Sequence, residues 1–187
     1  NKSRGYLIEL NPNGTYNLYN VNNDRDTQTT YTDALVTQSV QSNISLPPDG
    51  VIFVEDNVWV RSNPTFSGRV TIASGRLATS VATNINIADD LAYGAKNGTD
   101  VIGLVAEDSV EIAPYAAPAT GSFTLEVNAA ILAASGNVVY RRLYNFASST
   151  CSRGWVNPAQ KLNFYGSIAV RQPWTWSWVG SSDCGDT

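Results

Sequence analysis

The chain contains no histidine and no methionine among its 187 residues, and it has few charged residues. Without histidine, a Ser–His–Asp or Cys–His catalytic triad and any histidine-ligated metal are excluded. Charged residues make up 15% of the chain, below the roughly 25% of ordinary soluble domains. The net charge of −4 also argues against a typical nucleic-acid-binding domain, which needs clustered Lys and Arg. An enzyme built from this sequence would have to use carboxylates, lysine or tyrosine.

Long hydrophobic runs are also missing. No segment approaches the about 18 consecutive apolar residues of a membrane-spanning helix, and no signal peptide opens the chain. Because the sequence starts at Asn1, we expect it to be a mature product or a piece of a longer protein.

Only two cysteines are present, Cys151 and Cys184, and their spacing fits no metal-ligand pattern. In a protein outside the reducing cytosol, such a pair predicts one disulfide that closes the C-terminal segment. Two unpaired thiols are the alternative.

One short pattern recurs between Gly50 and Gln172: an apolar strand, a polar break of two or three residues, and a second short strand. The copies are VIFVEDNVWV (51–60), INIADDLAY (85–93), IGLVAEDSVEI (102–112), AILAASGNVVY (130–140) and NFYGSIAV (163–170), with RVTIAS (69–74) as a further strand. Repeated strands with no helix between them predict an all-β fold, a parallel β-solenoid (β-helix). We expect about three strand faces per coil. The general preference of parallel crossovers predicts right-handed winding.

Three regions follow from this pattern. Residues 1–49 are predicted to form an N-terminal β-hairpin, with strands within 6–21 around Asn-Pro-Asn-Gly, and a capping segment. Within it, residues 31–46 fit either a short helix or strands. Residues 50–172 are the predicted solenoid, and residues 173–187 are a Trp-rich, disulfide-closed C-terminal cap.

The interior of the solenoid is predicted to hold branched apolar side chains. They are Val51, Phe53, Val58, Val60, Ile72, Ile85, Ile87, Leu104, Ile112, Leu132 and Val138. Irregular loops are expected at 75–83, 94–100, 113–122 and 145–160, where side loops of repeat proteins carry specificity.

Three acidic pairs occupy polar breaks of the repeat. They are Glu55–Asp56, Asp89–Asp90 and Glu107–Asp108. Stacked carboxylates could bind a structural calcium ion or serve as the general acid and base of a polysaccharide-active β-helix enzyme. The interpretation we favour is that these side chains cap backbone N–H groups at corners.

Tryptophans alternate in the C-terminal PWTWSW, so that one strand would place all three on one face. Exposed, they would form a platform for sugar stacking or protein docking. Buried, they would close the last coil. The candidate partner-binding residues are Trp174, Trp176, Trp178, Arg171, Arg141 and Arg142.

A local basic patch in the C-terminal third is a second candidate surface, and it would suit DNA. Its members are Arg141, Arg142, Arg153, Lys161 and Arg171. Phosphate contacts of this kind are weakened by salt, so a salt-dependent association with duplex DNA would identify the patch.

Several segments together resemble a known family. They are YLIELNPNGTYNLYNV (6–21), GVIFVEDNVWV (50–60), GRVTIAS (68–74), NINIADDLAY (84–93), DVIGLVAEDSVEI (100–112), AAILAASGNVVY (129–140) and LNFYGSIAV (162–170). Over roughly residues 5–172 the chain is similar to the extracytoplasmic domains of PilX-like pilus-assembly proteins and of minor pilins, including competence-associated ones with a β-solenoid domain.

The resemblance implies a non-enzymatic, extracellular, cell-surface or periplasmic domain of a type IV pilus-associated protein, which acts in pilus assembly, adhesion or DNA uptake. The implied partners are pilin subunits, with DNA or a surface glycan as further candidates, and no cofactor is expected. Proteins of this family contact the membrane through an N-terminal hydrophobic helix that this sequence does not contain. The family offers no catalytic motif to transfer.

Overall fold

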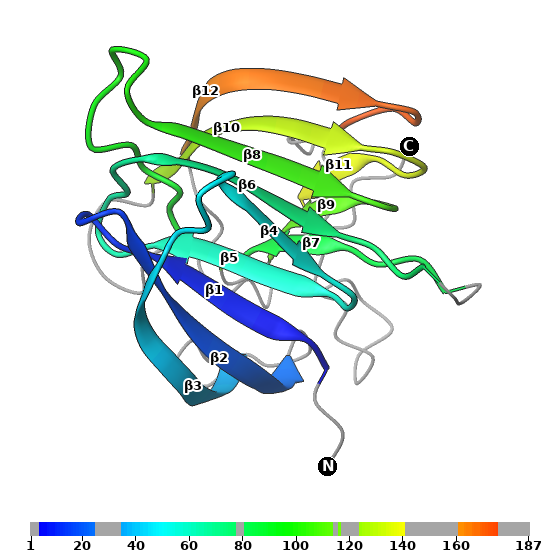
Figure 1. The fold of residues 1–187 in the computed structure, drawn as a ribbon. Helices are drawn as coiled ribbons and strands as arrows, with labels where there is room; N and C mark the ends of the chain where they lie inside the picture. Colours follow the sequence, from blue (N-terminus) through cyan, green and yellow to red (C-terminus); the bar gives the residue numbers. More distant parts are fainter. Residues whose placement is uncertain are drawn as a thin grey trace.

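The computed structural model describes residues 4–24, 35–77, 81–113, 116, 124–140 and 161–175, and within these ranges the chain forms strands and loops (Figure 1). The strands are β1 (Tyr6–Leu10), β2 (Thr15–Asp24), β3 (Leu35–Ser45), β4 (Val51–Val54), β5 (Val58–Ser62), β6 (Arg69–Ser74), β7 (Ile85–Ile87), β8 (Val101–Ala106), β9 (Val110–Ile112), β10 (Thr124–Ala133), β11 (Val138–Tyr140) and β12 (Lys161–Val170). The prediction of an all-β fold is therefore confirmed. In the described part of the chain, no helix has the length and apolarity needed to span a membrane.

The strands form two sheets. Sheet A has seven strands in the order β11-β9-β7-β5-β1-β2-β3, and sheet B has five in the order β12-β10-β8-β6-β4. From β4 onward, consecutive strands belong alternately to sheet B and sheet A (Figure 1). Every pairing among these later strands is parallel. Each passage of the chain therefore adds one strand to each sheet, in the same direction as the one before.

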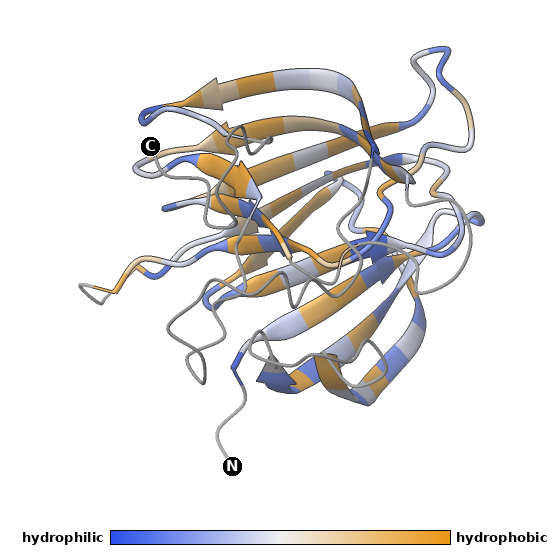
Figure 2. Ribbon diagram, turned by 180° about the vertical axis from the view of Figure 1, so that it is seen from behind, coloured by the Kyte–Doolittle hydropathy of each residue, from blue (hydrophilic) through white to orange (hydrophobic). Residues whose placement is uncertain are grey.

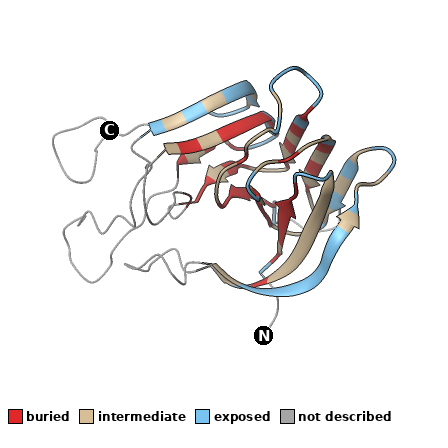
Figure 3. Cartoon of the chain, turned by 90° about the vertical axis from the view of Figure 1, so that its left-hand side faces the viewer, coloured by how far each residue is buried: buried red, intermediate tan, exposed pale blue. Residues whose placement is uncertain are grey.

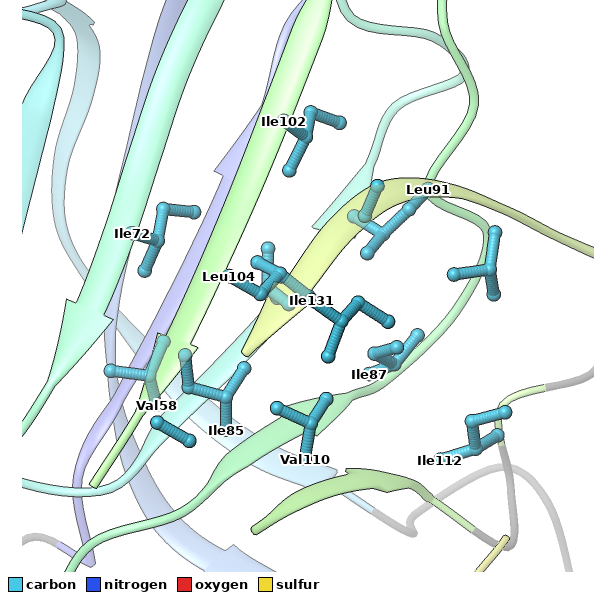
Figure 4. Close-up of a cluster of buried hydrophobic side chains, with 14 of the residues drawn as sticks. Val58, Ile72, Ile85, Ile87, Leu91, Ile102, Leu104, Val110, Ile112 and Ile131 are labelled. Carbon is cyan, nitrogen blue, oxygen red and sulfur yellow. The ribbon is translucent and has the colours of Figure 1, made fainter. Parts of the chain in front are cut away.

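Matching registers stack like side chains on top of one another in the core. In sheet B one inward row is Ile52, Ile72, Leu104, Ile131 and Ile168. In sheet A one inward row is Val58, Ile85, Val110 and Val138. Figure 4 shows members of both rows in one apolar layer; the buried members form a single cluster, and Ile52 and Ile168, at the two edges of sheet B, are partly buried and pack against it. Each fully buried aliphatic side chain contributes about 1.5–3 kcal/mol, so this layer is the main source of stability.

The predicted N-terminal hairpin is confirmed. β1 and β2 pair antiparallel, and the turn between them is closed by the N–H of Asn11, which donates to the carbonyl oxygen of Thr15 at 2.9 Å. Gly14 has a φ of 73°, which glycine adopts without steric cost. β1 also pairs in parallel with β5, with Tyr6 opposite Val58, so the hairpin covers the free edge of β5.

The ambiguous segment that follows the hairpin is a strand where it is described. β3 pairs antiparallel with β2, with irregularities in the register. Most of its residues are exposed, which explains why polar Thr, Ser and Gln alternate irregularly with apolar residues there.

Three predicted core residues lie instead on the outside of sheet B. Val51 and Phe53 are 43% and 50% exposed, and Leu132 is 40% exposed, whereas their neighbours Ile52 and Ile131 point into the core. The error has a physical cause. Every residue in the runs VIFV and AILA is apolar. The sequence therefore cannot show which alternate residues face the core and which face solvent. The other eight predicted core residues are buried, as expected.

A second correction concerns NFYGSIAV, which was expected to contain a corner at Gly166–Ser167. The segment is part of one continuous strand, β12, whose register with β10 runs through Gly166 opposite Ala129. In INIADDLAY, the expected second strand is reduced to two isolated bridges, of Leu91 to Val127 and of Tyr93 to Phe66. The other copies of the repeat form two strands each, and RVTIAS is β6.

Candidate functional site

The outer side of sheet B carries two rows of uncharged side chains that cross all five strands. We call this surface the sheet B face. Its first row, the small row, consists of Val51, Thr71, Gly103, Ala130 and Ser167. Its second row, the large row, consists of Phe53, Ala73, Val105, Leu132 and Ala169. Figure 2 shows apolar residues along the strands of this sheet.

The sheet B face is open to solvent, whereas the outer side of sheet A is buried where β1 pairs with β5. Phe53 is 50% exposed on the former, while Leu7 and Trp59, on the outer side of sheet A, are 1% and 4% exposed. In Figure 3 the buried residues lie between the sheets, and β12 alternates between exposed and intermediate. Contiguous exposed apolar surface is uncommon in soluble monomers and marks contact sites for other molecules.

Charged residues lie toward the two ends of these strands, outside the two rows. At the amino end of β6, Arg69 is exposed, and its guanidinium donates to the carbonyl oxygens of Gly98 (2.9 Å) and Thr99 (3.4 Å). At the carboxyl ends of β4, β6 and β8, Glu55 and Glu107 lie on either side of Gly75. The ladder continues there: the N–H of Gly75 donates to the carbonyl oxygen of Val54 at 3.1 Å, and the N–H of Glu107 donates to that of Ser74 at 2.9 Å.

The two glutamates differ in their surroundings. Glu55 is exposed, while Glu107 Oε2 accepts from the backbone N–H groups of Arg76 (2.9 Å) and Thr83 (3.3 Å). Two arginines lie on this otherwise acidic rim. Arg76 is paired with Asp56, whereas Arg171, just after β12, has no ion pair within the described chain. The amino rim thus carries both signs, with Arg69 of β6 beside the exposed Asp49 that precedes β4, and the carboxyl rim is acidic around β4 and β8.

A tethered loop borders the face near β10 and β12. Lys96 Nζ lies 2.8 Å from Glu126 Oε1 and 5.4 Å from the centre of the Tyr165 ring. The hydrogen bonds from Lys96 and then Asn128, whose Nδ2 donates at 2.7 Å, lower the pKa of Glu126. Tyr93 meets Tyr165 edge to face at 6.4 Å. These contacts hold the predicted 94–100 loop against the sheet.

In each of the three acidic pairs at least one carboxylate accepts from backbone N–H groups, as the capping interpretation predicts. Asp56 Oδ1 accepts from the N–H of Asn57 at 2.8 Å and pairs with Arg76 at 2.5 Å. Asp90 Oδ1 accepts from the N–H of Glu126 at 2.7 Å, and burial raises the pKa of Asp90.

The three acidic pairs do not stack in one column. Glu55–Asp56 and Glu107–Asp108 follow strands of sheet B, whereas Asp89–Asp90 follows β7 of sheet A. Among the residues described, no three Cys, Asp or Glu side chains form a group that could hold a metal ion. A shallow depression beside the hairpin turn, lined by Asn11, Pro12, Asn13 and Asn43, offers amides and no acid, base or nucleophile.

One polar network could not be anticipated from the sequence. Glu9 in β1 is 4% exposed, and its carboxylate accepts from Arg61 Nε at 2.8 Å and Asn17 Nδ2 at 3.0 Å. Burial alone would raise the pKa of Glu9, but the Asn17 hydrogen bond and the Arg61 charge outweigh it and lower that pKa. Because its members come from β1, β2 and β5, the network joins the hairpin to the later strands.

The predicted partner-binding residues are only partly described. Trp174 is 56% exposed, and Arg171 is exposed too. The next residue, Thr175, pairs beside β11 through its N–H to the carbonyl oxygen of Val138 at 2.9 Å. The other candidates, Trp176, Trp178, Arg141 and Arg142, lie outside the described residues, as do the predicted disulfide partners Cys151 and Cys184.

The two described members of the basic patch lie far apart. Lys161 begins β12 and Arg171 follows its end, so the ten-residue span separates them by about 33 Å. They do not form one cluster.

The arrangement as a whole suits contact with another macromolecule better than catalysis. It offers a surface of uncharged side chains with charged rims, and three carboxylates near it, those of Asp56, Glu107 and Glu126, are bound by backbone amides or cations. Fold alone would not identify a function. Comparison with protein-family models, with curated proteins and with solved structures finds no match to this chain.

Proposed function

We propose that residues 50–172 form a β-solenoid whose successive coils contribute strands to sheet B and then sheet A. The alternation of parallel strands between the two sheets supports this reading. A rudimentary third face is supported by the parallel bridge between Phe66 and Tyr93, each of which follows a strand of sheet A and precedes the next strand of sheet B. Leu91, in the same segment as Tyr93, forms a parallel bridge to Val127 in the first half of β10. Right-handed winding is proposed on the general preference of parallel crossovers.

We further propose that the domain is a non-enzymatic assembly module of a type IV pilus-associated protein, a minor pilin, which acts outside the cytoplasm. The pilus setting rests on the resemblance of the strand motifs to PilX-like proteins. The observation that carries an assembly role is the exposed, uncharged sheet B face, in which apolar side chains as large as Phe53 and Leu132 remain open to solvent.

A rigid surface of this kind binds with little rearrangement. Its side chains project from strands that are hydrogen-bonded on both sides in β6, β8 and β10, so little conformational entropy is lost on contact. A flat face with charged rims also resembles the composition of protein–protein interfaces, which have an apolar centre and a polar border.

The experiment that tests the proposal uses the native full-length protein in its host. Filaments are sheared from the surface of wild-type cells and of a deletion strain, and their proteins are identified by mass spectrometry. We expect the protein in wild-type filaments, and we expect deletion to reduce piliation. A complemented strain is the control for effects on neighbouring genes.

The opposite result is equally clear. If the protein is missing from filaments and deletion leaves piliation unchanged, the pilus assignment is wrong. A free-standing adhesin or a carbohydrate-active protein would then be the better reading of the same surface.

A further inference from the structure

We infer that Lys96 and Asn128 form an isopeptide bond, a side-chain amide that joins the 94–100 loop to β10, and that Glu126 carries the protons of the reaction. The three side chains supply the nucleophile, the electrophile and the acid–base group that such a bond requires. The inference concerns a covalent modification of the folded chain and does not depend on the pilus setting.

One carboxylate oxygen holds the two reacting groups together. Lys96 Nζ lies 2.8 Å from Glu126 Oε1, and Asn128 Nδ2 donates to the same oxygen at 2.7 Å. The amide carbon of Asn128 is one bond from Nδ2, so the amine needs only a small displacement to reach the separation of about 3–3.5 Å from which bonds form. The side chain of Lys96 is 47% exposed, and its flexible stem permits this movement.

The sheet fixes the electrophile and the carboxylate. Glu126 and Asn128 are two residues apart on β10, so their side chains lie on the same side of the strand. Leu91 holds both backbones: its N–H donates to the carbonyl oxygen of Glu126 at 2.8 Å, and its carbonyl oxygen accepts from the N–H of Asn128 at 2.7 Å. Holding the reactants in one place makes the reaction intramolecular and removes much of its entropic cost.

The amide of Asn128 is buried, and its oxygen is unpaired. Asn128 is fully buried next to Tyr165, its partner in β12, and its Oδ1 has no hydrogen-bond donor. The ring centre of Tyr165 also lies 5.4 Å from Lys96 Nζ. A purely structural tether would gain nothing from a buried acceptor without a donor, which is unfavourable. In the reaction the same oxygen is free to accept a hydrogen bond from Glu126 once that carboxyl carries a proton.

The reaction exchanges one amide for another. Glu126 takes a proton from the Lys96 ammonium group, and the lone pair of the amine forms a bond to Cγ of Asn128 while the π electrons of the carbonyl move to Oδ1. When the carbonyl forms again, the Cγ–Nδ2 bond breaks and its electron pair leaves with Nδ2. Lys96 Nζ loses two protons in all, and Glu126 passes both to Nδ2, which is released as ammonium. No oxidant or reductant is required.

Slow chemistry is sufficient for such a bond. Glu126 is a weak base, because the hydrogen bonds from Lys96 and then Asn128 lower its pKa. The exchange has to occur only once in each molecule, whereas an enzyme must turn over repeatedly. Its product closes a loop between residues 96 and 128, which restricts the unfolded chain as a disulfide does.

The test is the intact mass of the purified 187-residue chain after incubation at neutral pH. We expect a mass that is lower than the sequence mass by one ammonia molecule. Lys96→Arg is the matched control, because it keeps a cation beside Glu126 and removes the nucleophilic amine. Lys96→Arg and Glu126→Gln should both show the full sequence mass. Both substitutions alter partly exposed side chains, so the variants should fold, and circular dichroism checks this.

Peptide mapping locates the loss. Asn13 and Asn97 each precede a glycine, and cyclisation of either onto the backbone would also release ammonia. With the isopeptide bond in place, trypsin should no longer cleave after Lys96. Further digestion after glutamate should leave residues 77–107 joined to residues 127–141 in one branched species.

An unchanged wild-type mass would overturn the inference, as would a loss of ammonia that persists in Lys96→Arg or maps to another pair of residues. Each of these results would leave the pilus assignment standing. Absence of the protein from filaments would likewise leave the isopeptide bond standing, so the two proposals fail separately.

Discussion

Replacing Leu104 with alanine is expected to lower the free energy of unfolding by about 3 kcal/mol, within the about 2–5 kcal/mol typical of buried leucines. Leu104 is fully buried in β8, between Ile72 and Ile131 of the neighbouring strands. The stacked rows of a parallel sheet cannot collapse into the space that is left, because the strands above and below fix their separation. Urea denaturation measures the change.

The adjacent residue supplies the matched control. Val105 points to the sheet B face and is only partly buried, so Val105→Ala should cost within about 1 kcal/mol in the monomer. Equal losses for the two variants would mean that both sides of sheet B are covered, which would contradict the exposed face. The comparison therefore also tests which residues of β8 face the core and which face solvent.

Gly166→Ala should be nearly as disruptive, with a loss of about 3 kcal/mol or detachment of β12. Gly166 has a φ of 155°, and a Cβ atom there would lie 1.8 Å from the carbonyl oxygen of Ala129. Both atoms belong to the paired backbones of β10 and β12, so neither can move without breaking the ladder. Hydrogen exchange of the β12 amides, together with urea denaturation, separates local detachment from global loss.

Gly75→Ala is the control for removing a glycine from this sheet. Its Cβ would find its nearest neighbours at 3.6–3.9 Å, in ordinary contact, so we expect a change within about 0.5 kcal/mol. If Gly166→Ala were as harmless as Gly75→Ala, the close pairing of β10 with β12 would be wrong.

The sequence was a good guide to strands and a poor guide to which way they face. RVTIAS and IGLVAEDSVEI alternate clearly, and their strands and buried residues were predicted correctly. VIFV is apolar at every position, so nothing local could show that Phe53 faces solvent. The phase is set by the register with β6, which depends on residues twenty positions further along the chain.

The candidate site was missed for the same reason. In sequence, exposed apolar residues such as Phe53 and Leu132 cannot be told from core residues, whereas the alternating tryptophans and the acidic pairs form patterns that suggest a site. Glycine in NFYGSIAV suggested a corner, but Gly166 is required by the close approach of Ala129, which lies 37 residues earlier. The Glu9–Arg61 pair spans 52 positions, and only the pairing of β1 with β5 brings its members together.

The central claim is that the sheet B face serves pilus assembly. The most direct test is the amount of protein in sheared filaments when a deletion strain is complemented with wild type, Leu132→Asp or Val40→Asp. The last two place the same charge at comparably exposed valine and leucine positions on different sheets. Total cellular amounts of each variant are measured beside the filaments, so that loss of folding is recognised.

We predict that wild type and Val40→Asp enter filaments equally and that Leu132→Asp is depleted about tenfold, while all three accumulate to similar total amounts. Equal incorporation of Leu132→Asp would contradict the claim, because the sheet B face would then have no part in assembly.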